Sequence, residues 1–197
     1  MIVKTIKVKL YTFDELSDEV KEKVLEEYRG INIDFDDWYE GIMLIWKEEL
    51  EKLGYDDVKI YFSGFYRQGD GACFEASVNI PKWIKAHKAS NRFKKLLNEY
   101  NNGADVLIRI THRRSDYYST STDVDYEGYD LSDKAYEQLE EMVKWIEEEE
   151  RKELGNKIYN DLEKEYEYLV SDEAVRETII ANDFMFTEGG ERKIYID

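Results

Sequence analysis

Apolar and polar residues alternate in several short stretches of the chain. The alternation is clearest in residues 58–65, 72–80 and 106–111, and the run of Tyr, Ser and Thr in residues 117–126 continues it. A period of two residues is typical of β-strands with one buried face. The β-branched residues of segment 2–11 indicate a further strand. We therefore expect an antiparallel sheet of about five strands, with 58–65 paired to 72–80 and 106–111 paired to 117–126.

Other stretches carry apolar residues at helical spacing. Thr12 and Ser171 are suited to begin helices as N-caps, Pro81 favours a helix start, and Gly30 and Gly54 favour helix ends. The predicted helices cover about residues 12–30, 36–53, 82–100, 132–154, 158–169 and 172–181. Strands and helices together predict an α+β fold, an antiparallel sheet flanked by helices.

No linker rich in Pro, Gly or Ser divides the 197 residues. We therefore expect one α+β domain over residues 1–197, with an acidic helical segment at 131–181 and a terminal β-hairpin within 184–196. Lysines interrupt the N-terminal stretch, and no run of about 18 uncharged apolar residues occurs. The sequence thus predicts neither a signal peptide nor a membrane span, and a cytoplasmic location.

The chain is strongly acidic, with 45 Asp and Glu against 28 Lys and Arg and a net charge of −17. Such a surface repels phosphates, so we expect direct nucleic-acid binding only through the basic segment 82–114. One cysteine, Cys73, cannot form an internal disulfide, and two histidines, His87 and His112, are too few for a Cys/His zinc site. We expect no metal or other cofactor, and interpret Cys73 and His87 as packed core residues.

Two stretches resemble known proteins. Residues 63–74 read Ser-Gly-Phe-Tyr-Arg-Gln-Gly-Asp-Gly-Ala-Cys-Phe, which is similar to an S-G-F-x-x-Q-G-D-G-A-x-F segment of small uncharacterised proteins encoded by bacteriophages and prophages. Residues 166–189, with Ser-Asp-Glu-Ala-Val at 171–175, look like the C-terminal part of the same group. The resemblance implies a viral or mobile-element origin, a location in the host cytoplasm, and no established activity.

The loop Gln68–Gly71 is the first candidate site. Two glycines beside Asp70 allow positive φ and would present backbone N–H groups to an anion or a small ligand. The alternative is a plain hairpin turn in which Asp70 bonds its own backbone.

A basic and aromatic cluster in residues 109–118 is the second candidate, because cations beside aromatic rings suit phosphate and base contacts. The cluster meets the loop if 72–80 and 106–111 are neighbouring strands. The predicted ligand site is then Arg67, Gln68, Gly69, Asp70, Gly71, Arg109, His112, Arg114 and Tyr117. The alternative is that these cations pair with the chain's own carboxylates.

The acid run of the long helix is the third candidate. Carboxylates along a rigid helix can imitate the phosphates of nucleic acid, and the partner-binding residues would be Glu147, Glu148, Glu149 and Glu150. An ordinary solvated helix face explains the same residues.

These observations favour a non-enzymatic, phage-type accessory protein that binds a host macromolecule, such as an anti-defence protein or a nucleic-acid-mimicking inhibitor. A protein that binds a small ligand or nucleotide through the Gln68–Gly71 loop and the basic cluster is the alternative. Charge complementarity between the basic segment 82–114 and the acidic helix also suits a homodimer. No residue is assigned a catalytic role.

Overall fold

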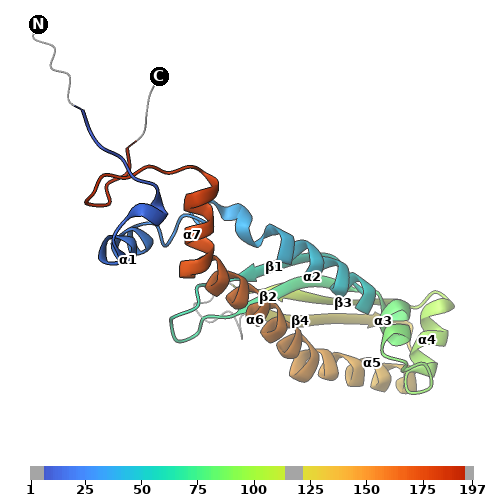
Figure 1. The fold of residues 1–197 in the computed structure, drawn as a ribbon. Coiled ribbons are helices and arrows are strands. Elements are labelled where there is room, and N and C mark those ends of the chain that lie inside the picture. The colour runs from blue at the N-terminus through green and yellow to red at the C-terminus, as the bar shows by residue number, and fades with distance from the viewer. Residues whose placement is uncertain (1–6, 114–121, 194–197) are drawn as a thin grey trace, which may run out of the picture. The chain divides into compact units, whose positions relative to one another are not determined.

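A computed structural model describes residues 7–113 and 122–193 and confirms the α+β class (Figure 1). In chain order its elements are η1 (Phe13–Glu15), α1 (Asp18–Glu27), η2 (Asp36–Tyr39), α2 (Glu40–Leu53), β1 (Tyr55–Phe62), β2 (Ala72–Val78), α3 (Ile80–Ala86), α4 (Lys94–Asn101), β3 (Asp105–His112), β4 (Thr122–Tyr129), α5 (Asp133–Trp145), the π-helical segment η4 (Ile146–Glu150), α6 (Arg151–Leu169) and α7 (Asp172–Ala181).

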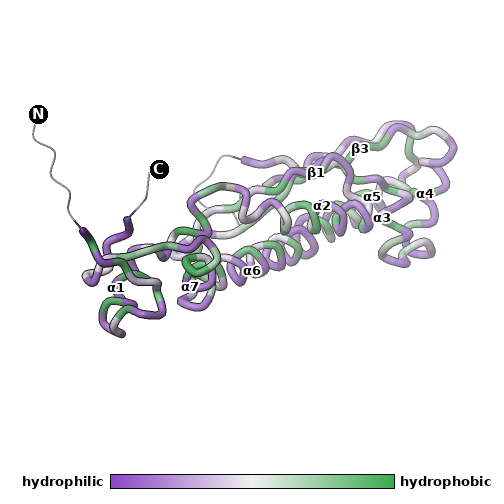
Figure 2. Tube along the Cα trace, turned by 45° about the horizontal axis from the view of Figure 1, so that its top comes forward, coloured by the Kyte–Doolittle hydropathy of each residue, from purple (hydrophilic) through white to green (hydrophobic). Residues whose placement is uncertain are grey.

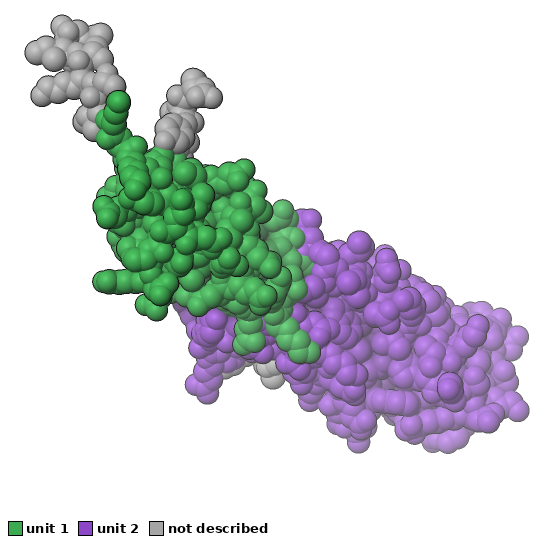
Figure 3. Space-filling model, in the orientation of Figure 1, with its two compact units in different colours: residues 1–39, 164–197 green, residues 40–163 purple. Residues whose placement is uncertain are grey.

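The chain divides into two compact units (Figure 3). Unit 1 comprises Met1–Tyr39 and Lys164–Asp197, and unit 2 comprises Glu40–Glu163. Compact units of one chain can unfold together or separately. The single domain over residues 1–197 therefore stays a prediction.

Unit 2 contains an antiparallel sheet with the strand order β1-β2-β3-β4. The two predicted strand pairs are confirmed, and β2 lies beside β3. The described residues form four strands in this sheet, not five. Residues 7–10 form no strand, and Tyr11 makes only an isolated bridge to Phe186. Residues 7–9 are all exposed, so this segment has no buried face that would favour strand pairing; residues 1–6 lie outside the described ranges.

Helices cover one face of this sheet (Figure 2). The core between the layers consists of side chains with almost no exposed surface, among them Leu50, Tyr55, Phe74, Trp83, Phe93, Leu96, Ile108, Ile110, Leu139 and Ile146. Each such side chain stabilises the fold by about 1.5–3 kcal/mol through burial. The opposite face carries polar residues at alternate positions, including Lys59, Glu75, Arg109 and Asp125. The two-residue period of the strands therefore separates a packed face from an open one.

The predicted helix 82–100 is two helices in the structure, α3 and α4. Asn79 caps α3, because its side-chain oxygen accepts a hydrogen bond from the Lys82 amide at 3.2 Å. Lys88 has a φ of +53°, which ends the α-helical conformation between the two helices. This break places His87 at the C-terminal end of α3.

The helices predicted at 132–154 and 158–169 are continuous in the structure, and Gly155 does not interrupt α6. A Cβ atom at this position would lie 2.6 Å from the carbonyl oxygen of Ala72. The glycine thus lets α6 approach the backbone of β2.

Unit 1 has its own small core, built from Phe13, Leu16, Val24, Val175, Ile179 and Phe186. The Thr12 capping box is present, but it closes only the short η1 turn, and α1 starts anew after the N-cap Ser17 because Leu16 is extended. Ser171 caps α7 as predicted. The predicted terminal hairpin is reduced to a bridge between Phe186 and Arg192, and residues 194–197 lie outside the described ranges.

Gly54 sets the turn that joins α2 to β1. Its φ is +100°, and a Cβ atom there would lie 2.4 Å from the backbone nitrogen of Trp83. Its carbonyl also accepts a hydrogen bond from the Asn79 amide at 2.8 Å. The start of α3, and with it Trp83, is therefore held against this turn.

Gly54→Ala is expected to lower the free energy of unfolding by about 3 kcal/mol or more, because backbone strain and a backbone clash add. Gly103→Ala is the matched control, since Gly103 has a φ of +98° and a Cβ atom there would meet open space among the described residues. It should cost about 1–2 kcal/mol through strain alone. Urea unfolding measures both; equal losses would contradict the close contact at Trp83.

Candidate functional site

The π-helical segment η4 interrupts a long buried stripe. Ile146, Leu154, Ile158 and Leu162 are buried along η4 and α6, and Glu150 occupies the same stripe between them. Residues spaced by four advance about 40° beyond a full turn of an α-helix, so the stripe would drift away from the sheet. A π turn holds more residues than an α turn and compensates for this drift. Glu150 consequently points into the core.

The carboxylate of Glu150 is bonded through both oxygens. Its side chain is 9% exposed, and its Oε1 lies 2.6 Å from Nε2 of His87. Its Oε2 accepts a hydrogen bond from Nε1 of Trp83 at 2.9 Å. The hydroxyl of Tyr55 lies 3.4 Å from the same indole nitrogen. Burial raises the pKa of Tyr55 well above its usual value, and the charge of Glu150 raises it further.

His87 completes this buried cluster of Tyr55, Trp83, His87 and Glu150. Its Nδ1 lies 2.8 Å from the carbonyl oxygen of Trp83, so both ring nitrogens face acceptors. An imidazolium satisfies both, and its charge is favourable at the C-terminal end of α3. Burial lowers the pKa of His87, but the hydrogen bonds to Glu150 and to the Trp83 carbonyl outweigh burial, so the pKa is raised above 6.5.

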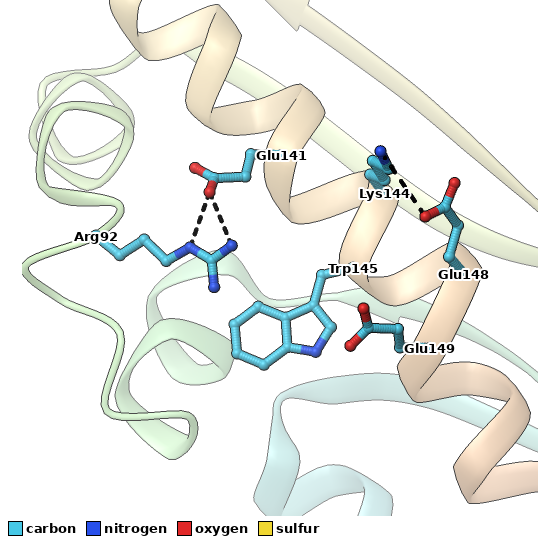
Figure 4. A pocket seen from close by; sticks show the side chains of 6 residues that line it. All are labelled: Arg92, Glu141, Lys144, Trp145, Glu148 and Glu149. Atoms are coloured by element: carbon cyan, nitrogen blue, oxygen red, sulfur yellow. Dashed lines mark hydrogen bonds and ion pairs between the residues drawn. The ribbon is translucent and has the colours of Figure 1, made fainter.

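A pocket of about 380 Å³ lies around Trp145 (Figure 4). It is lined by Arg92, Glu141, Lys144, Trp145, Glu148 and Glu149. Trp145 joins pocket and cluster, because its ring centroid lies 5.2 Å from that of Trp83 and 5.6 Å from that of His87. On the pocket side the guanidinium carbon of Arg92 lies 4.9 Å from the Trp145 ring centroid.

Arg92 is held in place by α5. Its Nε and Nη2 donate to Oε1 of Glu141 at 2.9 and 2.8 Å, and its carbonyl accepts a hydrogen bond from the Gln138 side chain at 2.7 Å. Gln138 also accepts from two amides of the first turn of α4, at 3.0 and 2.9 Å. The segment that carries Arg92 is thereby fixed to the helix that carries Trp145.

A second contact, in which α4 caps the start of α5, strengthens the pairing of these two helices. Glu99 of α4 accepts hydrogen bonds from the amide and the hydroxyl of Ser132, each at 2.8 Å, just before α5 begins. The Ser132 amide, with contributions from Lys95 and the Ser132 hydroxyl, lowers the pKa of Glu99 to about 2. A carboxylate at a helix N-terminus is electrostatically favourable.

The acid run Glu147–Glu150 is divided by the structure. Glu147, Glu148 and Glu149 are exposed, and Glu150 is buried. Lys144 approaches Glu148 at 3.9 Å, whereas Glu149 forms no ion pair within the described part of the chain. The pocket thus has one more carboxylate than cations, next to an indole ring. Such a surface suits a basic group, which carboxylates and an aromatic face both attract.

The Gln68–Gly71 loop has the geometry of the turn alternative. Oδ2 of Asp70 accepts hydrogen bonds from the amides of Tyr66 and Arg67 at 2.9 and 2.7 Å, and the Arg67 amide in particular lowers the pKa of Asp70. Gly69 takes a φ of +96°. These two amides are bonded to Asp70, and a ligand role for Arg67, Gln68, Gly69, Asp70 and Gly71 stays a prediction.

The basic cluster lies at the end of β3. The backbone amide of His112 donates a hydrogen bond to Glu75 at 3.2 Å. The imidazole ring of His112 stacks on the ring of Tyr61, with 4.5 Å between the ring centroids. Arg113 pairs with Asp123, as the alternative of internal ion pairs predicts. Arg109 is exposed on the open sheet face. Two further predicted residues, Arg114 and Tyr117, lie outside the described ranges.

Cys73 is buried, as expected for a packed core residue. Within residues 7–113 and 122–193, no cluster of three or more His, Cys, Asp or Glu side chains has the arrangement of a metal site. No helix among the described residues has the length and apolar character needed to cross a membrane.

The sequence indicated an acidic helix but missed the role of Glu150. A signal was present: Glu150 stands four residues after Ile146 and four before Leu154, both apolar. A lone acid in such a series is a candidate for a buried, paired carboxylate.

Fold and site together define an α+β protein with an exposed acidic surface and a buried carboxylate behind it. The chain belongs to the family of the domain of unknown function DUF8835, which matches residues 38–172. No curated protein and no solved structure matches the chain.

In the unfolded chain His87 titrates near its ordinary pKa of about 6.5. The folded protein retains the His87 proton to higher pH than the unfolded chain does. The stability contributed by the His87–Glu150 pair is therefore fully present below about pH 6.5 and is lost as pH rises through the raised pKa of His87. Urea unfolding from pH 6 to 9 should show this fall for the wild type and not for His87→Gln. His112→Gln is the control, as it removes a histidine without touching Glu150; identical profiles for both variants would contradict the assignment.

Proposed function

We propose that this protein is a binding protein that recognises a basic segment of a macromolecular partner. The binding site is the acidic surface, which consists of Glu141, Glu148 and Glu149 around Trp145. One observation carries the proposal: the buried Glu150 holds η4 so that Glu148 and Glu149 are exposed beside the Trp145 indole ring.

The contacts of the pocket suggest how a partner would bind. Arg92 already lies against Trp145 and pairs with Glu141 in the free protein. A lysine or arginine of the partner would occupy the remaining space beside Glu148 and Glu149. Each exposed ion pair contributes only about 0.2–1 kcal/mol, so useful affinity requires several basic residues in one segment.

Charge supports the same kind of partner. A net charge of −17 accelerates association with basic molecules and repels acidic ones. Such association weakens as salt screens the charges. The resemblance of residues 63–74 to phage-encoded proteins suggests a host macromolecule as the partner, including an enzyme whose basic surface normally takes nucleic acid.

Binding of a fluorescent oligolysine peptide tests the proposal by anisotropy. Glu148→Gln with Glu149→Gln should weaken binding at low salt by about two- to thirtyfold, the effect of losing two exposed ion pairs. Raising the salt concentration should reduce the difference between wild type and variant.

The control variant carries Glu19→Gln and Glu22→Gln, two exposed acids of α1. It loses the same two charges at another place. If both double variants weaken binding equally, the peptide responds to net charge alone and the acidic surface is not a site.

A further inference from the structure

The outer side of β4 is a regular sheet edge. All eight residues of β4 pair with β3 on its inner side, from Asp105↔Tyr129 to His112↔Thr122, without a register shift. The other edge strand, β1, has a register shift between Asp56 and Lys59. Irregular strands resist pairing with other chains, and regular ones accept it. Of the two edges, β4 is the one suited to accept another strand.

β4 is also held firmly by the helix layer. A Cβ atom at Gly128 would lie 2.8 Å from Cδ2 of Leu139 and 2.9 Å from Cδ1 of Leu131. The glycine therefore allows α5 to pack directly on the strand. An edge that is already in place requires little ordering when it binds.

Carboxylates flank this edge on both sides. On the open face Asp123, Asp125 and Glu127 alternate along β4. Asp123 pairs with Arg113 and Asp125 accepts a hydrogen bond from Thr111 at 3.2 Å. The nearest described partner of Glu127 is the Tyr129 hydroxyl, at 3.5 Å.

On the helix side, Glu140 and Glu147 lie near Tyr126. Burial raises the pKa of Tyr126, and Tyr136 and the charges of these two acids raise it further. The charge of Glu147 also acts on Arg151, whose Nη1 donates to the hydroxyl of Thr122 in β4 at 2.6 Å. An added strand would thus have Asp125 and Glu127 on its open-face side and Glu140 and Glu147 on its helix side.

This distribution of charge indicates which kind of strand binds at the outer edge of β4. A second copy of β4 would place its own acids against Asp125 and Glu127, and like charges on facing strands are destabilising. A strand with Lys or Arg at alternate positions would place its cations there instead. We infer that the outer edge of β4 binds an extended basic segment of a partner protein as a fifth strand, through main-chain hydrogen bonds and alternating ion pairs. The inference rests on the proposed preference for a basic partner and adds a second surface and the partner's conformation.

The test uses a peptide of alternating Lys and Thr and a second peptide in which every other backbone amide is N-methylated. Both carry the same charge, but N-methylation removes main-chain donors. With the wild-type protein, N-methylation of the amides that face β4 should weaken binding at least about tenfold, so both methylation registers are measured. Amides of β4 should gain hydrogen-exchange protection when the parent peptide binds.

Two variants separate this site from the acidic surface. Asp125→Lys with Glu127→Lys should weaken binding of the alternating peptide at least about tenfold, because attraction becomes repulsion at two positions. Glu148→Gln with Glu149→Gln should change it less than about twofold.

Equal binding of parent and both N-methylated peptides, or no added protection in β4, would overturn strand addition. If only the Glu148 and Glu149 variant loses peptide binding, the acidic surface stands and the β4 site is wrong. If neither variant loses binding of this peptide, the β4 site is wrong, and the oligolysine experiment decides separately on the acidic surface. Wild-type self-association through β4 would also overturn the choice of occupant.

Discussion

The structure of unit 2 depends on one buried carboxylate. Glu150 joins η4 to α3 through His87 and Trp83, and the Trp83 indole also contacts Tyr55 of β1. A charge at such a depth is very costly unless it is paired and fully hydrogen-bonded, and here both oxygens have partners. The interaction therefore favours the one helix register that brings Glu150 inward. It explains why a π-helical segment, which is rare in proteins, persists at Ile146–Glu150.

The exposed surface follows from this buried contact. When Glu150 points inward, Glu147, Glu148 and Glu149 are exposed, and Trp145 lies between the cluster and the pocket. Because α4 and α5 cap each other through Gln138 and Glu99, the pocket wall that carries Arg92 is fixed to the same helix. A surface that is rigid before binding loses little conformational entropy when a partner binds. Core packing and the proposed binding function are thus linked through a single helix.

The sequence predicted the α+β class, both strand pairs and the capping of α7, because period and cap chemistry are local signals. The sequence-based predictions were wrong where contacts between distant residues determine the local structure. The sequence predicts a gap between the helices 132–154 and 158–169, yet Gly155 lies inside α6, where its missing Cβ lets the helix approach β2 closely. In the acid run, spacing alone distinguishes Glu150, which stands four residues from Ile146 and from Leu154; its partner His87 lies 63 positions away. The spacing could have marked Glu150 as buried, but a contact between such distant residues leaves no periodic signal, so its pairing with His87 could not be predicted.

The most direct test of the buried contact is the free energy of unfolding of Glu150→Ala beside that of Glu149→Ala, measured by urea denaturation. Both variants remove one carboxylate from adjacent positions of the same segment. Loss of Glu150 leaves His87 and the Trp83 indole without their partner and should cost about 3–5 kcal/mol. Loss of the exposed Glu149 should change stability by no more than about 0.5 kcal/mol. Equally small effects for the two variants would contradict the central role of the Glu150 contact.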